Sequence, residues 1–175
     1  MLKRQATSTT IAIKKDIATT IRELDAQRAE AANRDSRKYR GILKRFDLLP
    51  GENPDSLLRA VKDQVLTRLE LEETGALLGA HRLPRSRDKV GPPPVLLTFR
   101  SIADRARFFA RRKKLEGSPW SLDDDLTPAQ QQQRRDQWPD FIRHKTSPEK
   151  PKAFWRGGDL YLNGTRWQPP RAPPG

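Results

Sequence analysis

The order of six short segments between residues 42 and 122 constrains the fold more than any other feature of the sequence. Four are apolar runs bounded by turn residues, which predicts strands over residues 42–48, 76–83, 95–99 and 120–122. Two have apolar residues at helical spacing, which predicts helices over residues 54–74 and 101–115. This order, strand–helix–strand–strand–helix–strand, is typical of split βαβ folds. The predicted class is α+β, with a ferredoxin-like βαββαβ domain of the RNA-recognition type.

The periodicity also predicts which side chains face the core. On the first strand these are Ile42, Phe46 and Leu48. The first helix begins after an N-cap, Asn53, with Pro54 at its first position, and we expect it to end before Gly75. Its apolar stripe consists of Leu57, Leu58, Val61, Val65 and Leu69. The second helix is expected to bury Ile102, Ala106 and Phe109.

Segments on either side of this domain complete the predicted organisation. Residues 1–39 form a helical arm or the end of a coiled coil, 40–126 the RNA-recognition-like domain, and 127–167 a small helix-plus-hairpin domain. Residues 168–175 form a disordered proline-rich tail. Pro139 should divide the helix of the small domain. In the arm, three residues at heptad spacing predict oligomerisation, with a frayed basic arm as the alternative: Ile17, Ile21 and Leu24.

Charge indicates the class of partner. The chain has 35 Lys and Arg against 22 Asp and Glu, which gives a net charge of +13. Residues 81–120 alone contain eleven basic and three acidic residues. Apolar residues make up only 34% of the chain, so the core must be modest. A basic field of this kind is typical of proteins that bind nucleic acid.

Other function classes lack their characteristic residues. The absence of cysteine excludes disulfides, thiol catalysis and cysteine-built zinc sites, and the two histidines belong to no metal-binding pattern. We interpret the one acidic run, residues 123–125, as favourable charge before a helix N-terminus. The sequence therefore predicts no enzyme, no metal and no cofactor. It contains no apolar run of membrane-spanning length and no secretory signal.

Two groups of residues are candidates for nucleic-acid contact. The helix over residues 101–115 offers six basic side chains for phosphate: Arg105, Arg107, Arg111, Arg112, Lys113 and Lys114. In the hairpin, Trp155 and Tyr161 lie beside Arg156 and suit stacking on bases, with packing against the helix as the alternative. For Trp138 and Trp167 we expect packing. The central strands offer only Phe46 and Phe99, which disfavours base stacking on the sheet.

Several motifs, in order over residues 40–167, resemble one family. They are Leu48-Leu49-Pro50, Ala80-His81-Arg82-Leu83, Pro94 to Phe99, Arg111 to Leu115 with Gly117, Asp125 to Pro128, Arg134 to Pro139 with Phe141, Lys152 to Arg156, and Leu160 to Gly164. The chain resembles the first-open-reading-frame protein of LINE-1-type long interspersed retrotransposons, the type-22 transposase group.

The resemblance implies a trimeric coiled-coil stalk, an RNA-recognition-like domain and a small C-terminal domain. It implies largely sequence-independent binding of single-stranded RNA, or DNA, in ribonucleoprotein particles with nucleic-acid chaperone activity. These particles would lie in the cytoplasm, with the nucleus as the alternative. The binding positions that the resemblance implies are Arg82, Arg111, Arg112, Lys113, Arg134, Arg135, Trp155, Arg156 and Tyr161.

The sequence departs from the family in two places. The stalk is short, and Arg112-Lys113-Lys114 stands where mammalian members have an arginine-glutamate-lysine-glycine motif. The alternative interpretation is a host-retained scaffold subunit docked in a larger ribonucleoprotein such as a ribosome.

Overall fold

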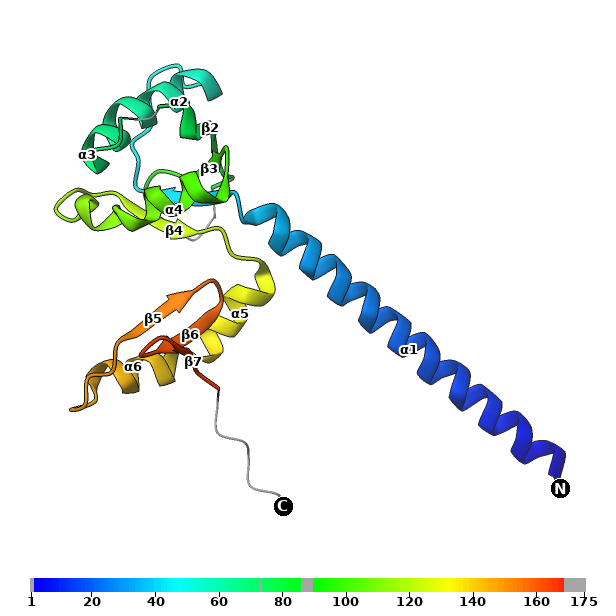
Figure 1. The fold of residues 1–175 in the computed structure, drawn as a ribbon. Coiled ribbons are helices and arrows are strands. Elements are labelled where there is room, and N and C mark those ends of the chain that lie inside the picture. The colour runs from blue at the N-terminus through cyan, green and yellow to red at the C-terminus, as the bar shows by residue number, and fades with distance from the viewer. Residues whose placement is uncertain (1, 73, 86–89, 169–175) are drawn as a thin grey trace. The chain divides into compact units, whose positions relative to one another are not determined.

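The chain forms two compact units that divide between Asp35 and Ser36. The computed structural model describes residues 2–72, 74–85 and 90–168. It has a long N-terminal helix and two antiparallel sheets, which confirms the predicted α+β class with an N-terminal helix (Figure 1). The predicted disorder of the tail lies outside the described residues, except for Gln168.

The first unit consists of most of helix α1, Leu2–Arg37, as predicted. Intrahelical ion pairs join Asp25 to Arg28 and Glu30 to Arg34. The seam residues are each about half exposed: Ile17, Ile21 and Leu24. Isolated helices gain little stability from local propensity, so an exposed apolar stripe is consistent with association through this face. Oligomerisation stays a prediction.

A four-stranded sheet organises the first half of the second unit. Its strands are β1 (Arg40–Lys44), β2 (Leu77–Arg82), β3 (Val95–Phe99) and β4 (Ser121–Asp124), in the order β2-β3-β1-β4. Every pairing is antiparallel. One face is buried beneath the helices and includes Leu43, Leu97 and Leu122. The other face includes Ile42, which lies opposite Leu96 on β3 and Asp123 on β4.

The predicted inward face of the first strand was wrong. Leu43 is buried, whereas Ile42 lies on the opposite face and Leu48 is 61% exposed. The strand ends at Lys44 because Arg45 adopts a left-handed backbone with φ of 59°, which breaks the alternation. Phe46 reaches the core from the loop beyond this bend.

The first helical region runs through α2 (Pro54–Val61), a π-helical turn (Lys62–Leu66) and α3 (Thr67–Leu69). A capping box between Asn53 and Ser56 starts it, as Asn53-Pro54 predicts. Leu57 and Leu69 are buried, with Val61 and Val65 between them. A spacing of four residues exceeds the 3.6 per turn of an α-helix, and the wider π turn takes up the excess. The helix ends at Glu70, in the left-handed region with φ of 54°, and not at Gly75.

The predicted inward face of the second helix was wrong at Ile102 and Ala106, whereas Phe109 packs against the buried core as predicted. In α4 (Ile102–Ala110), followed by a 3₁₀ turn (Arg112–Leu115), the buried residues are Asp104 and Phe108. Ile102 is 49% exposed, Ala106 is exposed and Phe109 is half-buried. Phe108 packs edge-on against Phe99 of β3, with ring centroids 4.9 Å apart. Asp104 tolerates burial because Ser101 and Arg100 donate hydrogen bonds to its carboxylate.

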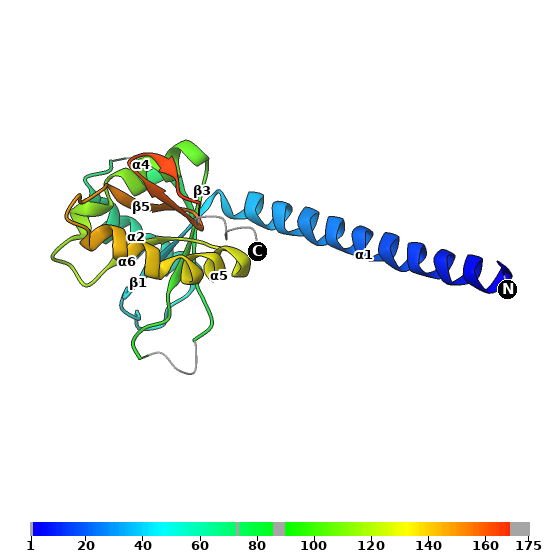
Figure 2. The ribbon, with the colours of Figure 1, turned by 90° about the horizontal axis from the view of Figure 1, so that it is seen from below.

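The C-terminal part pairs two helices with a second small sheet (Figures 1 and 2). Helices α5 (Pro128–Asp136) and α6 (Trp138–Thr146) meet at Gln137, two residues before Pro139, which lies in the first turn of α6. The predicted division of the helix near Pro139 is thus confirmed. Strands β5 (Ala153–Arg156), β6 (Asp159–Leu162) and β7 (Thr165–Arg166) form a sheet in that order, which confirms the predicted hairpin. Its first turn is Gly157-Gly158. A Cβ on Gly158 would lie 2.9 Å from Cα of Gln130, so the turn packs directly on α5.

Candidate nucleic-acid interface

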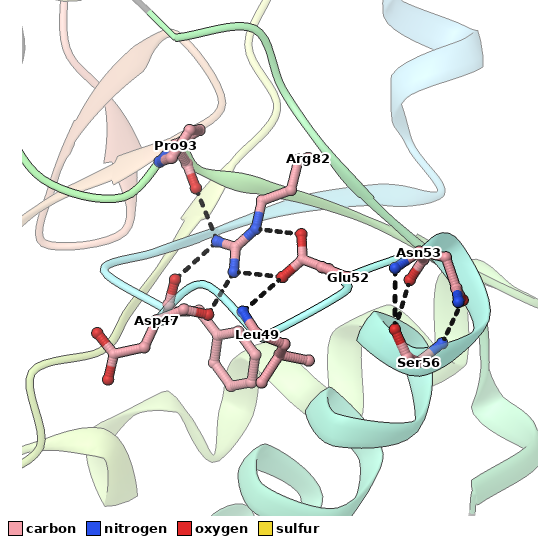
Figure 3. A network of polar contacts seen from close by, with 8 residues as sticks. Asp47, Leu49, Glu52, Asn53, Ser56, Arg82 and Pro93 are labelled. Atoms are coloured by element: carbon pink, nitrogen blue, oxygen red, sulfur yellow. Dashed lines mark hydrogen bonds and ion pairs between the residues drawn. The ribbon is translucent and has the colours of Figure 1, made fainter.

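Arg82, one of the binding positions that the resemblance implies, has all its guanidinium donors bonded within the protein (Figure 3). Its Nε and Nη2 donate to the two carboxylate oxygens of Glu52, each at 2.9 Å. Its Nη1 donates to the carbonyls of Phe46 at 2.7 Å and Pro93 at 2.9 Å, and Nη2 also donates to the carbonyl of Asp47. These five bonds use all five guanidinium donors. A phosphate contact by Arg82 would require breaking them.

The Arg82–Glu52 pair is largely shielded from water, since the two side chains are 14% and 13% exposed. The hydrogen bonds from Arg82 hold the pKa of Glu52 below its ordinary value of 4.5, and a bond from the Leu49 amide acts in the same direction. The pair thus ties the loop after β1 to the end of β2. We call these residues, Arg82, Glu52 and the three carbonyls, the Arg82 clamp.

The lowered pKa of Glu52 gives a pH dependence with a defined sign. Glu52 contributes stability that is present above its unfolded pKa, ordinarily 4.5, and is lost as the pH falls through its lower folded value. We expect the Glu52→Gln variant to be less stable at neutral pH and to lose less further stability in acid. Urea unfolding from about pH 6 to about pH 3 measures this. Parallel pH profiles for both proteins would contradict it.

Two more of the predicted binding arginines make internal contacts around Asp124. Arg105 donates to the carbonyl of Arg40 at 2.6 Å, pairs with Asp124, and stacks over the ring of Phe109 at 4.1 Å. Arg134, on α5, donates to the carbonyl of Gly157 at 2.8 Å and lies 3.7 Å from Asp124. Asp124 therefore links α4, β4 and α5.

The other two residues of the acidic run are also paired with basic side chains. Lys44 on β1 pairs with Asp123, and Arg37 pairs with Asp125 at 2.7 Å. The run thus ties neighbouring elements together, and its predicted effect on the N-terminus of α5 stays a prediction. That helix is capped by Thr127 and Gln130. Among the described residues, no three His, Asp or Glu side chains converge to hold a metal ion.

A cleft of about 730 Å³ lies between the open face of the four-stranded sheet and helices α5 and α6. Its apolar floor includes Ile42 and Leu96, and Trp138 borders it on the helical side. Acidic residues 123–125 contribute three negative charges. Five basic residues line it, so its charge is net positive: Arg37, Arg40, Lys44, Arg134 and Arg135. We call this site the basic cleft.

The basic residues of α4 and of the turn after it fall into two groups, those with partners inside the protein and those without a described partner. Arg111 donates to the carbonyls of Leu69 and Glu70, and so satisfies the C-terminus of α3. Lys114 pairs with Glu70, and the 62% exposed Arg107 lies 3.9 Å from Asp104. Arg112 and Lys113 are exposed, and their side chains make no hydrogen bond or ion pair with the part of the chain that the structure describes.

The aromatic residues of the C-terminal part lie on two faces. Trp155 packs between helix and sheet, with its ring parallel to that of Trp138 at 6.5 Å and 5.3 Å from that of Phe141. Arg134 lies over the ring of Trp155, with its Cζ 5.2 Å from the ring centroid. Trp167 packs near His144. The packing predicted for Trp138 and Trp167 is confirmed, although Trp138 remains 50% exposed. For Trp155 the structure favours packing too.

The fold also brings to these surfaces several residues that the sequence pattern does not single out. Arg37, Arg40 and Lys44 were counted in the net charge but not identified as candidates. A signal for Arg40 and Lys44 was their spacing on either side of Ile42, since alternate residues of a strand share a face. Phe154 was missed as well. It lies opposite Tyr161 in the hairpin, on the face away from Trp155.

Comparison of the chain with models of known protein families found no match, and comparison with curated proteins found none either. Within residues 2–72, 74–85 and 90–168, no helix combines the length and the apolar character needed to cross a bilayer.

Proposed function

We propose that this protein binds single-stranded RNA without catalysis and with little sequence preference, coats it as ribonucleoprotein and acts as a nucleic-acid chaperone. The observation that carries the proposal is the basic cleft, where five cationic side chains from β1, α5 and the end of α1 border one groove. Phosphate neutralisation of this kind gives affinity that carries no sequence information. The resemblance to retrotransposon RNA-binding proteins supports the same interpretation.

The sheet supports the finer fold assignment. The element order β1-α2-β2-β3-α4-β4 with sheet order β2-β3-β1-β4 is that expected of a ferredoxin-like domain of the RNA-recognition type. The open face differs from a base-stacking sheet in its composition. Phe46 and Phe99 are both buried on the helical side, so the open face offers aliphatic residues and charge. We therefore assign the cleft to the phosphate backbone.

Within this proposal the predicted binding residues have different roles. Arg82, Arg105 and Arg111 stabilise the fold, because their guanidinium groups already bond to the protein. Arg134 orders the hairpin against α5. Phosphate contacts come from residues whose charged ends reach solvent: Arg40, Lys44, Arg112, Lys113 and Arg135. Lys44 also pairs with Asp123, and Arg40 lies 4.0 Å from Asp125, but both side chains stay more than one-third exposed. Homotrimers would form through Ile17, Ile21 and Leu24.

The test is the salt dependence of binding to a single strand. We expect the double variant Arg40→Gln/Arg135→Gln to lower the affinity about tenfold and to reduce the slope of log affinity against log salt by about 0.7 per lost phosphate contact. Binding is measured by fluorescence anisotropy of a labelled RNA strand across a salt series.

The matched control removes the same charge from another surface. Arg59 and Lys62 lie on the first helical region, outside the cleft, and their side chains make no ion pair with any described residue. Arg59→Gln/Lys62→Gln should leave the slope nearly unchanged. Equal effects of the two double variants would mean that net charge alone drives binding and that the cleft is not the site.

A further inference from the structure

The outer face of the C-terminal sheet carries a pair of stacked aromatic rings. Phe154 of β5 lies directly opposite Tyr161 of β6 in the strand register. Their ring centroids are 5.5 Å apart, with the planes inclined by only 18°. Side chains alternate along a strand, so these rings face away from Trp155 and Leu160, which pack toward the helices. Both rings are half-buried, which leaves part of each in contact with solvent.

Core packing does not account for this pair. The space between the sheet and helices α5 and α6 is filled from the other face by Leu160, which is completely buried, and by Trp155 with Phe141. The two rings contact each other, and no other aromatic ring or cationic group lies against them among the described residues. The solvent-facing part of this half-buried ring pair is therefore free to contact a flat apolar ligand.

The charges around the ring pair identify what would cover it. Arg156 of β5 and Lys152, the residue before that strand, are exposed and make no side-chain ion pair with the described part of the chain. Arg166, opposite Tyr161 on β7, pairs with Asp159 and is 57% exposed. An aromatic surface with cations at its border complements a base together with its phosphate.

We propose that Phe154 and Tyr161 form a stacking platform for unpaired bases, bordered by Lys152, Arg156 and Arg166. The proposal rests on the proposed function and adds a source of preference for single strands. Paired bases in a duplex are stacked on their neighbours and cannot reach a protein ring, whereas the bases of a single strand can. The basic cleft holds phosphates, and the platform distinguishes a strand that has free bases from one that has none.

The test compares two probes with the same number of phosphates. One is an RNA strand of about 16 nucleotides, and the other is an abasic strand of equal length. We expect the unmodified protein to bind the RNA strand about tenfold more tightly than the abasic strand. In Phe154→Leu/Tyr161→Leu, which keeps apolar side chains at both positions, this difference should disappear while the salt dependence stays the same.

A second variant separates loss of the rings from damage to the hairpin. Phe154→Tyr/Tyr161→Phe exchanges the two rings and keeps the platform, so it should retain the tenfold preference. Near-ultraviolet circular dichroism checks that each variant is folded. The comparison of probes with the unmodified protein needs no variant and stands even if the leucine variant does not fold.

The outcomes distinguish the two proposals. Equal, salt-dependent binding of both probes by the unmodified protein would overturn the platform and leave the proposed function standing. A preference that survives in the folded leucine variant would also overturn it, since the bases would then be read elsewhere. Weak binding of both probes, with no salt dependence, would overturn the proposed function and the platform with it.

Discussion

Replacing Arg82 with glutamine should lower the free energy of unfolding by about 3–5 kcal/mol. The substitution leaves the shielded carboxylate of Glu52 without its charged partner, and it leaves three backbone carbonyls without a hydrogen-bond donor. Urea unfolding followed by circular dichroism measures the change as a lower midpoint. The effect on RNA affinity, measured under conditions where the variant is folded, should be small. A large loss of stability with little loss of RNA affinity would show that Arg82 stabilises the fold and does not contact RNA.

Two further variants test whether the loss of stability in Arg82→Gln comes from the broken Arg82–Glu52 pair. Arg112→Gln removes an exposed charge without a described partner and should change stability by no more than about 0.5 kcal/mol. The double variant Arg82→Gln/Glu52→Gln should recover part of the lost stability, since no unpaired charge is left. If Arg82→Gln kept its unfolding midpoint and lost RNA binding, Arg82 would be a contact residue, as the resemblance implies.

A second large effect is expected at Phe108. Phe108→Ala should cost about 3–5 kcal/mol, because it opens a cavity against Phe99 beneath the sheet. Ile102→Ala removes an exposed side chain from the same helix and should cost no more than about 0.5 kcal/mol. Thermal and urea unfolding of the two single variants measure both values.

The comparison of these two variants also tests which face of α4 is buried. Both place alanine, which has a higher helix propensity than Phe or Ile, in the same helix, so a change in helix propensity cannot explain a large difference in cost between them. Similar costs for the two, or a larger cost at Ile102, would mean that α4 packs through the face that the sequence pattern predicts.

Local signals were sufficient to predict most of the elements. Asn53-Pro54 and Thr127-Pro128 each place a capping side chain before proline at the first helical turn, and both helices begin there. The apolar run at residues 95–99 forms β3, one of the two central strands of the sheet. The two glycines after Arg156 formed the hairpin turn. These features depend on residues within a few positions of each other, which a sequence displays directly.

The orientation of α4 could not be predicted in the same way. Apolar residues at positions 102, 106 and 109 and the single Phe108 define two different faces. The choice between them depends on Phe99, which the chain places under the helix only after the sheet has formed. The buried Asp104 makes the pattern harder to read, since it needs Ser101 and Arg100 as partners before burial is tolerable.

The candidate site shows the same limit more strongly. The excess of basic residues predicts an affinity for nucleic acid, but it does not say which cations are neutralised inside the protein. Arg82 finds Glu52 thirty positions away in the sequence, and Arg105 finds Asp124 across the sheet. Because of these long-range pairings, several of the twelve residues expected to bind nucleic acid instead stabilise the fold. Arg40 and Lys44 line the cleft instead, although the sequence pattern of their strand indicates only a structural role.

The contact between Gly158 and Gln130 limits how this protein can vary in length. Surface turns usually accept inserted residues, yet an insertion at Gly157-Gly158 would lift the hairpin away from α5, because even one added carbon meets Cα of Gln130 at 2.9 Å. At Gly164, in the next turn, an added carbon would meet nothing within 4 Å. Of the two turns of this sheet, the second is therefore the one that can accept added residues, and it is the better place for a fluorescent label or a peptide tag.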